Sequence, residues 1–232
     1  ALATITDDSA LGGSTIERSL RFNGSDTYIQ RTSSGGNRRT WTVSFWAKFC
    51  DSSATTDQRL WSCDGNSGNY DMLKIEFYGG TDSARRIAII DQNHASSGIR
   101  FTLNRKFRDS SAWYHFVFAQ DSTQSTASER MKIYVNGVRE TEFLDNSTHN
   151  HPPNQDYQGN VNATGKTNTW GRSFAFGSGT GTYLDGYLAN INFIDGAQLD
   201  PSYFGYTEFQ TKAWRPKKLN KSDIPNSPTT TY

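Results

Sequence analysis

The chain has 232 residues, of which 24 are Lys or Arg and 23 are Asp or Glu, so its formal net charge is +1 at pH 7. This balance gives no reason to expect nucleic acid or an anionic membrane as a partner, and it argues against a basic-groove mechanism. Aromatic residues make up 13% of a chain that is only 34% hydrophobic, which favours thin β layers over long amphipathic helices. The length fits one large domain.

No stretch approaches the roughly 20 consecutive apolar residues of a membrane-spanning helix. The start, Ala1 to Thr4, lacks the charged and apolar regions of a signal peptide. Because the chain begins without Met, we expect either processing or a longer product. Cys50 and Cys63 each follow a predicted strand. A disulfide between them and two free thiols both stay open, and free thiols are favoured because two cysteines are too few for a disulfide framework.

From Ser19 onward, apolar and polar residues alternate with a period of two, which predicts strands with one buried face. In residues 41–49 every odd position is apolar. The same alternation predicts strands at 73–77, 99–103, 131–135 and 187–193. Residues 113–118 are apolar at both parities, as in a central strand that is covered on two sides.

Turn signals separate these strands. Asn136-Gly137 suits a type I′ hairpin, and Asp195-Gly196 is a similar signal. The best helical candidate is a single turn that begins at Pro201, with Asp200 as its N-cap. Strands that follow one another through tight turns predict an all-β fold of two packed antiparallel sheets.

The composition also suggests the domain organisation. We expect residues 1–18 to form a lead-in segment, residues 19–211 a sandwich, and residues 212–232 an arm or linker, because that last part is basic and then rich in Pro, Ser and Thr. Between residues 144 and 172 the alternation fails, so we expect a long surface loop of the kind that often carries binding residues.

Four segments resemble, in the same order, the concanavalin A-like, laminin-G-like jelly-roll family. They are SLRFNG with Tyr28-Ile29, the strand at 41–48, the pair at 113–117 and 131–137, and the stretch at 176–201. The resemblance implies a jelly-roll sandwich, and the side chains expected between its sheets are Trp41, Phe45, Trp113, Val117, Ile133, Val135, Phe176, Leu188 and Ile191. The family includes lectins, adhesion modules, calcium-binding proteins and glycanases, so the fold does not fix the function.

The segment LDPSYFG at 199–205, followed by WRPKK at 214–218, resembles a segment of tailed-bacteriophage virion proteins, especially tail fibres and related appendages. Those proteins usually continue into a Gly- and Tyr-rich strand, which residues 219–232 do not match. The resemblance implies a virion protein, either a tail fibre or a surface decoration, whose jelly roll binds a host-surface glycan or contacts other virion proteins. A homotrimer is one such assembly. The alternative is an extracellular carbohydrate-binding or adhesion module of a secreted protein.

Three sets of residues are candidates for binding. Trp214 and Arg215 are expected to contact a partner, because Trp offers a large apolar area and Arg bonds carboxylates. Sugar recognition combines an aromatic platform with planar hydrogen-bonding side chains, and the predicted long loop supplies these types in Tyr157, Asn168, Trp170 and Arg172. Packing of that loop, or a subunit interface, is the open alternative.

Asp64, Asn66 and Asp71 would be the first ligands of a Ca²⁺ site in a Gly-rich loop, although a polar hairpin loop that bonds its own backbone is favoured. His149 and His151 from three subunits would supply six nitrogens to a transition metal, but exposed loop histidines are favoured. We therefore expect no cofactor. His115 is expected in the core or on the sheet surface.

We expect no enzymatic activity. Glycan hydrolysis on this scaffold needs two carboxylates about 5 to 9.5 Å apart, and on a strand they take the form E-x-D-x-E, which the sequence lacks. Glu76 stands alone, and Glu140 with Glu142 is expected to be solvated.

Overall fold

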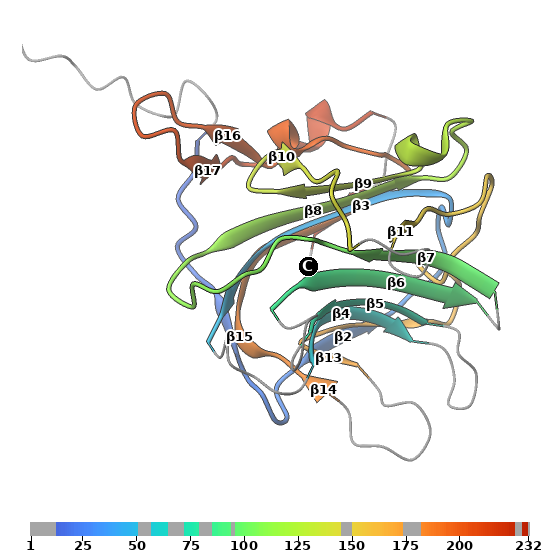
Figure 1. Ribbon diagram of the computed structural model, residues 1–232, viewed down its shortest axis with the longest axis horizontal. Helices are drawn as coiled ribbons and strands as arrows, with labels where there is room; N and C mark the ends of the chain where they lie inside the picture. The colour runs from blue at the N-terminus through green and yellow to red at the C-terminus, as the bar shows by residue number, and fades with distance from the viewer. Residues whose placement is uncertain are drawn as a thin grey trace, which may run out of the picture.

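The computed structural model of the chain describes residues 13–50, 57–64, 72–78, 85–93, 96–144, 150–173, 182–225 and 229–231. Two antiparallel seven-stranded sheets lie face to face, as Figure 1 shows. The predicted all-β sandwich is confirmed. None of the helices in the described residues is long and apolar enough to cross a membrane.

The first sheet has the order β1-β15-β3-β8-β9-β10, with β18 also paired to β15. Its strands are β1 (Leu20–Asn23), β3 (Thr40–Phe49), β8 (Tyr114–Asp121), β9 (Met131–Val135), β10 (Val138–Arg139), β15 (Asp185–Asp195) and β18 (Thr229–Thr231). These strands come from the early, middle and late parts of the sequence, and β1 and β18 both pair with β15.

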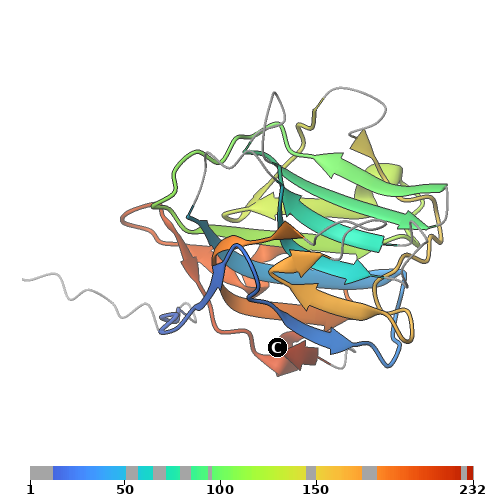
Figure 2. The ribbon, with the colours of Figure 1, turned by 90° about the horizontal axis from the view of Figure 1, so that it is seen from below.

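The second sheet has the order β11-β7-β6-β5-β4-β12-β2. Its strands are β2 (Ile29–Thr32), β4 (Gln58–Asp64), β5 (Met72–Phe77), β6 (Ile87–Asn93), β7 (Ser96–Thr102), β11 (Asn150–His151) and β12 (Thr167–Trp170). Figure 2 shows the same sheets from below. Two short ribbons and three 3-10 turns complete the described structure: β13 (Arg172–Ser173) with β14 (Thr182–Tyr183), β16 (Gly205–Thr207) with β17 (Trp214–Pro216), η2 (Ala127–Glu129), η3 (Pro201–Tyr203) and η4 (Lys221–Asp223).

The space between the sheets is filled largely by aromatic rings. Trp170 stacks on Trp61 with ring centroids 5.5 Å apart and meets Phe45 edge-on at 5.3 Å. The predicted core residues Trp41, Phe45, Ile133, Val135, Leu188 and Ile191 are buried in this cluster. Phe176 lies outside the described residues.

Two predicted core positions, Val117 on β8 and Trp113 directly before it, are wrong for one reason. Phe116 and Phe118 face the space between the sheets, so the odd positions of this strand face the other way. Trp113 is accordingly 36% exposed, and Val117 belongs to a separate apolar cluster on the outer face. The sequence shows residues 113–118 as apolar throughout, and only the pairing with neighbouring strands assigns the faces.

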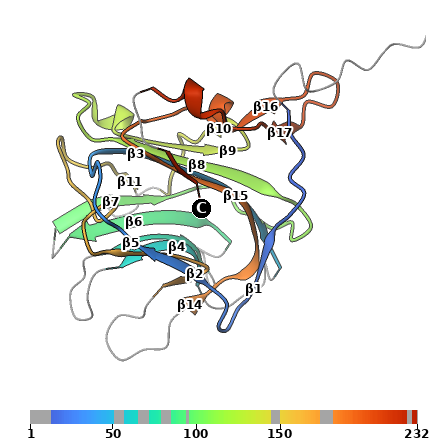
Figure 3. The same cartoon turned by 180° about the vertical axis from the view of Figure 1, so that it is seen from behind.

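The outer face of the first sheet carries a second core. Residues of the sheet pack there against the segment that follows β15, and Figure 3 shows this segment above β3 and β8. The buried members are Val117, Ala119, Ile194, Ala197, Leu199, Phe204 and Ile224. The expectation that β3 is half-buried is therefore wrong: Thr42 and Ser44 are both fully buried. Thr42 holds the covering segment, because its hydroxyl donates to the Ala197 carbonyl at 2.7 Å and accepts from the Leu199 amide at 2.8 Å.

The described parts of residues 212–232 do not form a separate arm. β17 pairs with β16, β18 pairs with β15, and Ile224 is buried in the outer core. The predicted lead-in segment joins the same region, since Gly13 bridges to Lys217 and the Ser14 amide donates to the Pro216 carbonyl at 3.1 Å. Leu219 and Ile224 pack against or within the outer core, and this packing holds a segment whose polar composition suggests no fixed structure.

Two of the local turn predictions are confirmed, whereas Asp195-Gly196 is not a hairpin turn, because β15 and the next strand, β16, are not paired. Asn136 and Gly137 have φ values of 48° and 80°, both in the left-handed region that a type I′ hairpin requires. The Asp200 carboxylate accepts a hydrogen bond from the Ser202 amide at 2.8 Å and caps η3. The predicted loop between 144 and 172 is only partly a loop, because β12 enters the second sheet between β4 and β2.

Candidate functional site

A groove of about 310 Å³ lies on the outer face of the first sheet, between the lead-in segment and the C-terminal ribbon. Its lining residues are Ile16, Glu17, Arg18, Ser19, Trp46, Trp113, Ala189, Trp214, Arg215 and Pro216. Three tryptophans from three separate parts of the chain therefore meet in one groove, together with two arginines and one glutamate. Figure 1 shows the ribbon of β16 and β17 at one end of the sheet, beside the N-terminal segment.

The strand register explains why these rings meet. Trp46 of β3 lies opposite His115 of β8 on one side and Ala189 of β15 on the other. Residues directly opposite each other in an antiparallel pair project from the same face, so this row shares the outer face. Trp46 is 7% exposed, and its indole nitrogen is buried without a hydrogen-bond partner among the described residues. A buried donor of this kind is costly unless a ligand or water bonds to it.

A row of aromatic and basic side chains continues from the groove. Tyr187 of β15 lies opposite Arg21 of β1 and Lys48 of β3. The Tyr187 ring is 6.3 Å from the Trp113 ring, and the Arg21 guanidinium lies 5.2 Å from the Tyr187 ring centre. The partly exposed Tyr187 ring and the Arg21 guanidinium thus continue the aromatic and basic surface along the sheet.

Trp214 fixes the position of one wall. Its indole nitrogen donates to Nδ1 of His115 at 3.0 Å, and the two rings stack at 5.9 Å. Since Nδ1 accepts, the proton sits on Nε2, which donates to the Ser44 hydroxyl at 2.8 Å. Burial lowers the pKa of His115 to about 3, so the ring is neutral and this arrangement is stable near neutral pH. Any side chain at Gly137 or Gly205 would overlap the Trp214 ring.

Trp214 and Arg215 were expected to contact a partner, and both make contacts within the chain. Trp214 packs on the sandwich, and the Arg215 guanidinium forms an ion pair with Glu208 at 3.2 Å. Arg215 is nonetheless exposed on the rim of the groove. Contact of these residues with another molecule stays a proposal.

The four residues expected to bind glycan do not form one exposed site. Trp170 and Asn168 are 2% and 7% exposed, because β12 is an interior strand of the second sheet. Trp170 therefore offers no ring face to a sugar, and that prediction is wrong. Arg172 lies over the rings of Tyr28 and Tyr183, at 4.8 Å and 5.4 Å from their centres. Tyr157 packs against the inner core.

The expected metal ligands are not assembled in the described residues. Asp64 ends β4, whereas Asn66, Asp71 and His149 lie outside the described residues, and His151 belongs to the short edge strand β11. In the part of the chain that the structure describes, no three His, Cys, Asp or Glu residues are grouped to hold a metal ion. Cys50 is exposed and Cys63 is buried, and no disulfide joins them. The Cys63 thiol donates to the Asn160 carbonyl at 3.2 Å.

The buried carboxylates have structural partners. Glu76 is fully buried beside Arg59 and Lys74, with the Lys74 ammonium 3.1 Å away. Glu140 was expected to be solvated, but its side chain is 9% exposed and pairs with Arg105 at 2.9 Å. Burial raises its pKa, and Arg105 opposes that shift. Burial likewise raises the pKa of Asp91 to about 6, although the Asn160 side chain donates to its carboxylate at 2.7 Å.

In the tryptophan groove, Glu17 is the single carboxylate among the described lining residues. The groove therefore has the side chains for binding, whereas hydrolysis of a glycosidic bond normally uses two carboxylates.

Residues 23–200 match the family described as the concanavalin A-like lectin/glucanases superfamily. The chain belongs to this superfamily. A search of curated proteins found no match. The matched region contains the second sheet and the first sheet apart from β18 and most of β1. Residues 16–19 and 214–216, which line the groove, both lie outside the superfamily match.

Solved structures share the superfamily fold at low sequence identity. A tailspike protein from an Escherichia coli bacteriophage aligns with a TM-score of 0.54 and 12% identity over 84% of this chain and 24% of the tailspike. The LG1-3 region of the laminin alpha2 chain aligns with a TM-score of 0.52 and 14% identity over 77% of this chain and 31% of that one. Domain 4 of an extracellular arabinanase from Geobacillus stearothermophilus, solved with arabinotriose, aligns with a TM-score of 0.50 and 15% identity over 78% of this chain and 72% of that one. At these identities the likeness shows the fold alone.

Proposed function

We propose that this concanavalin A-like domain is a non-enzymatic glycan-binding module of a tailed-phage particle, and that the tryptophan groove is its sugar site. The observation that carries the proposal is the convergence of Trp46, Trp113 and Trp214 on one groove with Arg18 and Arg215 at its rim. The groove volume of about 310 Å³ is at the small end of ligand pockets, which span about 300 to 1,000 Å³.

The chemistry of a sugar ring fits this arrangement. A pyranose has one apolar face and a polar rim of hydroxyl groups, so it binds where an aromatic face lies beside hydrogen-bonding groups. Trp113, at 36% exposure, provides the ring face. The unpartnered indole N–H of Trp46 can donate to a sugar hydroxyl, and the two guanidinium groups are planar donors for the rim.

Two further observations support a place in a phage particle. The segments at 199–205 and 214–218 resemble virion appendage proteins, and they form η3 and the ribbon that bounds the groove. A phage tailspike is also among the proteins that share the fold. In this setting the domain is displayed outward to bind a host-surface glycan, with other virion proteins, or two further copies of the chain, as its partners.

The second candidate is an extracellular carbohydrate-binding module of a secreted protein. The observation that favours it is the shared fold of an arabinanase domain that was solved with arabinotriose. The two candidates predict the same groove and differ in where the chain is found. Mass spectrometry of purified particles of the encoding virus detects the chain if the virion proposal is right, whereas its absence from particles supports the second candidate.

Glycan binding is tested with an array of bacterial surface polysaccharides and with titration calorimetry on the strongest ligand. Trp113→Ala is expected to weaken binding at least tenfold, because it removes the exposed ring face. Tyr28→Ala is the matched control, since Tyr28 is 38% exposed and directly precedes β2 of the second sheet. It is expected to leave the affinity within twofold. Absence of any glycan ligand, or an unchanged affinity in Trp113→Ala, would contradict the proposal.

A further inference from the structure

A second cavity, of about 500 Å³, adjoins the tryptophan groove. Residues 16–18 line both spaces, so the lead-in segment lies between them. The lining residues of the second cavity are Ser14, Thr15, Ile16, Glu17, Arg18, Asn190, Asn192, Lys218, Leu219 and Lys221. Nothing in the glycan-binding proposal requires this cavity, and its chemistry differs from that of the groove.

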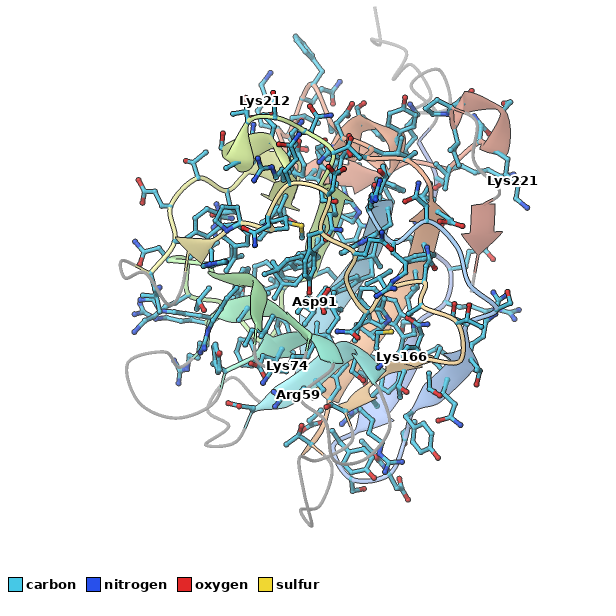
Figure 4. All side chains as sticks on the ribbon, turned by 90° about the vertical axis from the view of Figure 1, so that its right-hand side faces the viewer. Arg59, Lys74, Asp91, Lys166, Lys212 and Lys221 are labelled. Carbon is cyan, nitrogen blue, oxygen red and sulfur yellow. The ribbon has the colours of Figure 1, made fainter. Side chains whose placement is uncertain are left out.

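Positive charge dominates the cavity. Arg18, Lys218 and Lys221 line it with Glu17 as the opposing charge, and none of the three cations forms an ion pair with an acidic side chain among the described residues. Figure 4 shows Lys221 on the short turn at the edge of the molecule. Like charges that share a cavity repel one another, and an anion placed between them removes that cost. This local excess stands out because the whole chain carries a formal net charge of only +1.

The backbone beside these cations is irregular. The register of β15 against β3 shifts between Ala189 and Asn192, which forms a bulge. Asn190 at the bulge has φ = 46°, in the left-handed region, and its side chain is exposed. Asn192 is 3% exposed, and its side-chain amide donates to the Asn190 carbonyl at 3.0 Å. Bulges often re-aim a side chain at a functional site, and this one presents the Asn190 carboxamide to the basic cavity.

We infer that this cavity binds the acidic group of an anionic glycan whose sugar ring occupies the tryptophan groove. The inference rests on the proposed function and adds the charge of the ligand. A carboxylate or a sulfate provides the same chemistry: several acceptor oxygens with negative charge, which two ammonium groups, a guanidinium and an amide can bond. Because residues 16–18 line both spaces, a ligand that occupies the groove lies next to the basic cavity.

The test uses pairs of polymers that differ only in charge. Polygalacturonate is compared with its fully methyl-esterified form, and dextran sulfate with dextran, by calorimetry at physiological ionic strength. The acidic member of at least one pair is expected to bind at least tenfold more tightly than its neutral partner. Preference within the first pair identifies a carboxylate ligand, and preference within the second identifies a sulfate ligand.

Two variants assign the preference to the cavity. Lys218→Ala with Lys221→Ala is expected to reduce the acidic-to-neutral ratio at least fivefold, whereas Arg31→Ala with Lys166→Ala removes the same charge near β2 and β12 and leaves the ratio unchanged. Asn190→Gly keeps a residue that tolerates the left-handed backbone, so it is expected to fold normally and to lower acidic binding at least threefold.

The outcomes separate the two proposals. If neutral and acidic polymers bind equally and Trp113→Ala weakens both, the anionic-ligand inference is wrong and the glycan site stands. If the acidic preference survives in the lysine variant, the inference is also wrong, because the charge recognition lies elsewhere. If no polymer and no array glycan binds, both proposals fail together.

Discussion

The indole nitrogen of Trp214 donates to Nδ1 of His115 across 3.0 Å, and this bond joins the C-terminal ribbon to the middle of the first sheet. His115 in turn donates to Ser44 on the neighbouring strand. A residue of the phage-like segment is thus bonded into a buried network that begins on β3. The segment that resembles virion proteins is therefore part of the folded domain and at the same time a wall of the candidate sugar groove.

Trp214→Ala is expected to lower the free energy of unfolding by about 2 to 4 kcal/mol, because the ring fills the space between Gly137 and Gly205. Urea unfolding measures the change. Phe209→Ala is the control: that ring lies on the loop between β16 and β17 and is 81% exposed, so its loss should cost less than about 0.5 kcal/mol. Equal effects in the two variants would show that the ribbon does not depend on Trp214.

The contribution of His115 to the free energy of unfolding is lost in acid. Burial moves its pKa from 6.5 to about 3, so the folded state disfavours the charged ring and binds fewer protons than the unfolded state. The contribution is complete above pH 6.5 and is lost as the pH falls toward 3, amounting to about 3 kcal/mol at pH 4. His115→Gln should remove this dependence. The slope of unfolding free energy against pH, compared between wild type and variant, is the measurement, and identical slopes would refute the assignment.

The pH dependence of stability due to Asp91 has the opposite sign to that due to His115. Its pKa rises from 3.8 to about 6 because the carboxyl is buried, so the folded state favours the protonated form. Its stabilising term is complete below pH 3.8 and is lost as the pH rises through 6, at a cost of about 3 kcal/mol. Over pH 4 to 6 this change opposes that of His115, and the wild-type curve is expected to be nearly flat. Asp91→Asn should expose the acid loss due to His115, and a curve that remains flat would contradict both assignments.

The strands, the family-like segments and the tight turns could be predicted from the sequence, because each depends on a pattern of neighbouring residues. Asn136-Gly137 and Asp200 act through backbone geometry that neighbouring residues determine, and both are confirmed. The face of β8 could not be predicted, since residues 113–118 are apolar at every position and only pairing with β3 and β9 tells the two faces apart. Trp113 and Val117 were misplaced for this reason.

The candidate site was missed because it depends on contacts between distant segments. Trp46 is an apolar residue at a position of β3 where the alternating pattern otherwise has polar residues. The sequence near Trp46 does not show that Trp214, far along the chain, packs on the same face. The long loop gave a plausible set of sugar-binding residue types, yet β12 places Trp170 in the inner core. Residue type indicates a chemistry, whereas exposure depends on the tertiary fold.

Glu76 lies fully buried between Arg59 and Lys74. Glu76→Ala should destabilise the domain by about 3 to 5 kcal/mol, because it removes the buried carboxylate that faces both basic groups, while Arg59 keeps its longer pair with Asp57 at 3.6 Å. Glu129→Ala is the matched control: Glu129 also pairs with two basic residues, Lys132 and Arg139, but its side chain is 38% exposed. That change should cost less than about 1 kcal/mol. Thermal and urea unfolding would rank the pairs, and a control as damaging as Glu76→Ala would contradict the argument.

Truncation after Gly205 tests whether the C-terminal segment is an arm or part of the core. The sequence alone predicts that the sandwich survives this deletion, but the structure predicts the opposite. Removal of residues 206–232 takes away Ile224 and Trp214 and uncovers Val117, Ile194 and Phe204, which are buried in the outer core or against it. Exposed apolar surface of this kind favours aggregation and loss of fixed packing.

The truncated chain is therefore expected to bind the dye ANS, to lose near-ultraviolet circular dichroism and to unfold at a lower temperature. Ile224→Ala in the full chain provides a graded comparison, with an expected cost of about 2 to 4 kcal/mol because the side chain is 6% exposed. A truncated domain that keeps the melting temperature and the near-ultraviolet spectrum of the full chain would show that the inner core alone sustains the fold. The segment would then be a detachable arm, and the tryptophan groove would lack a fixed wall.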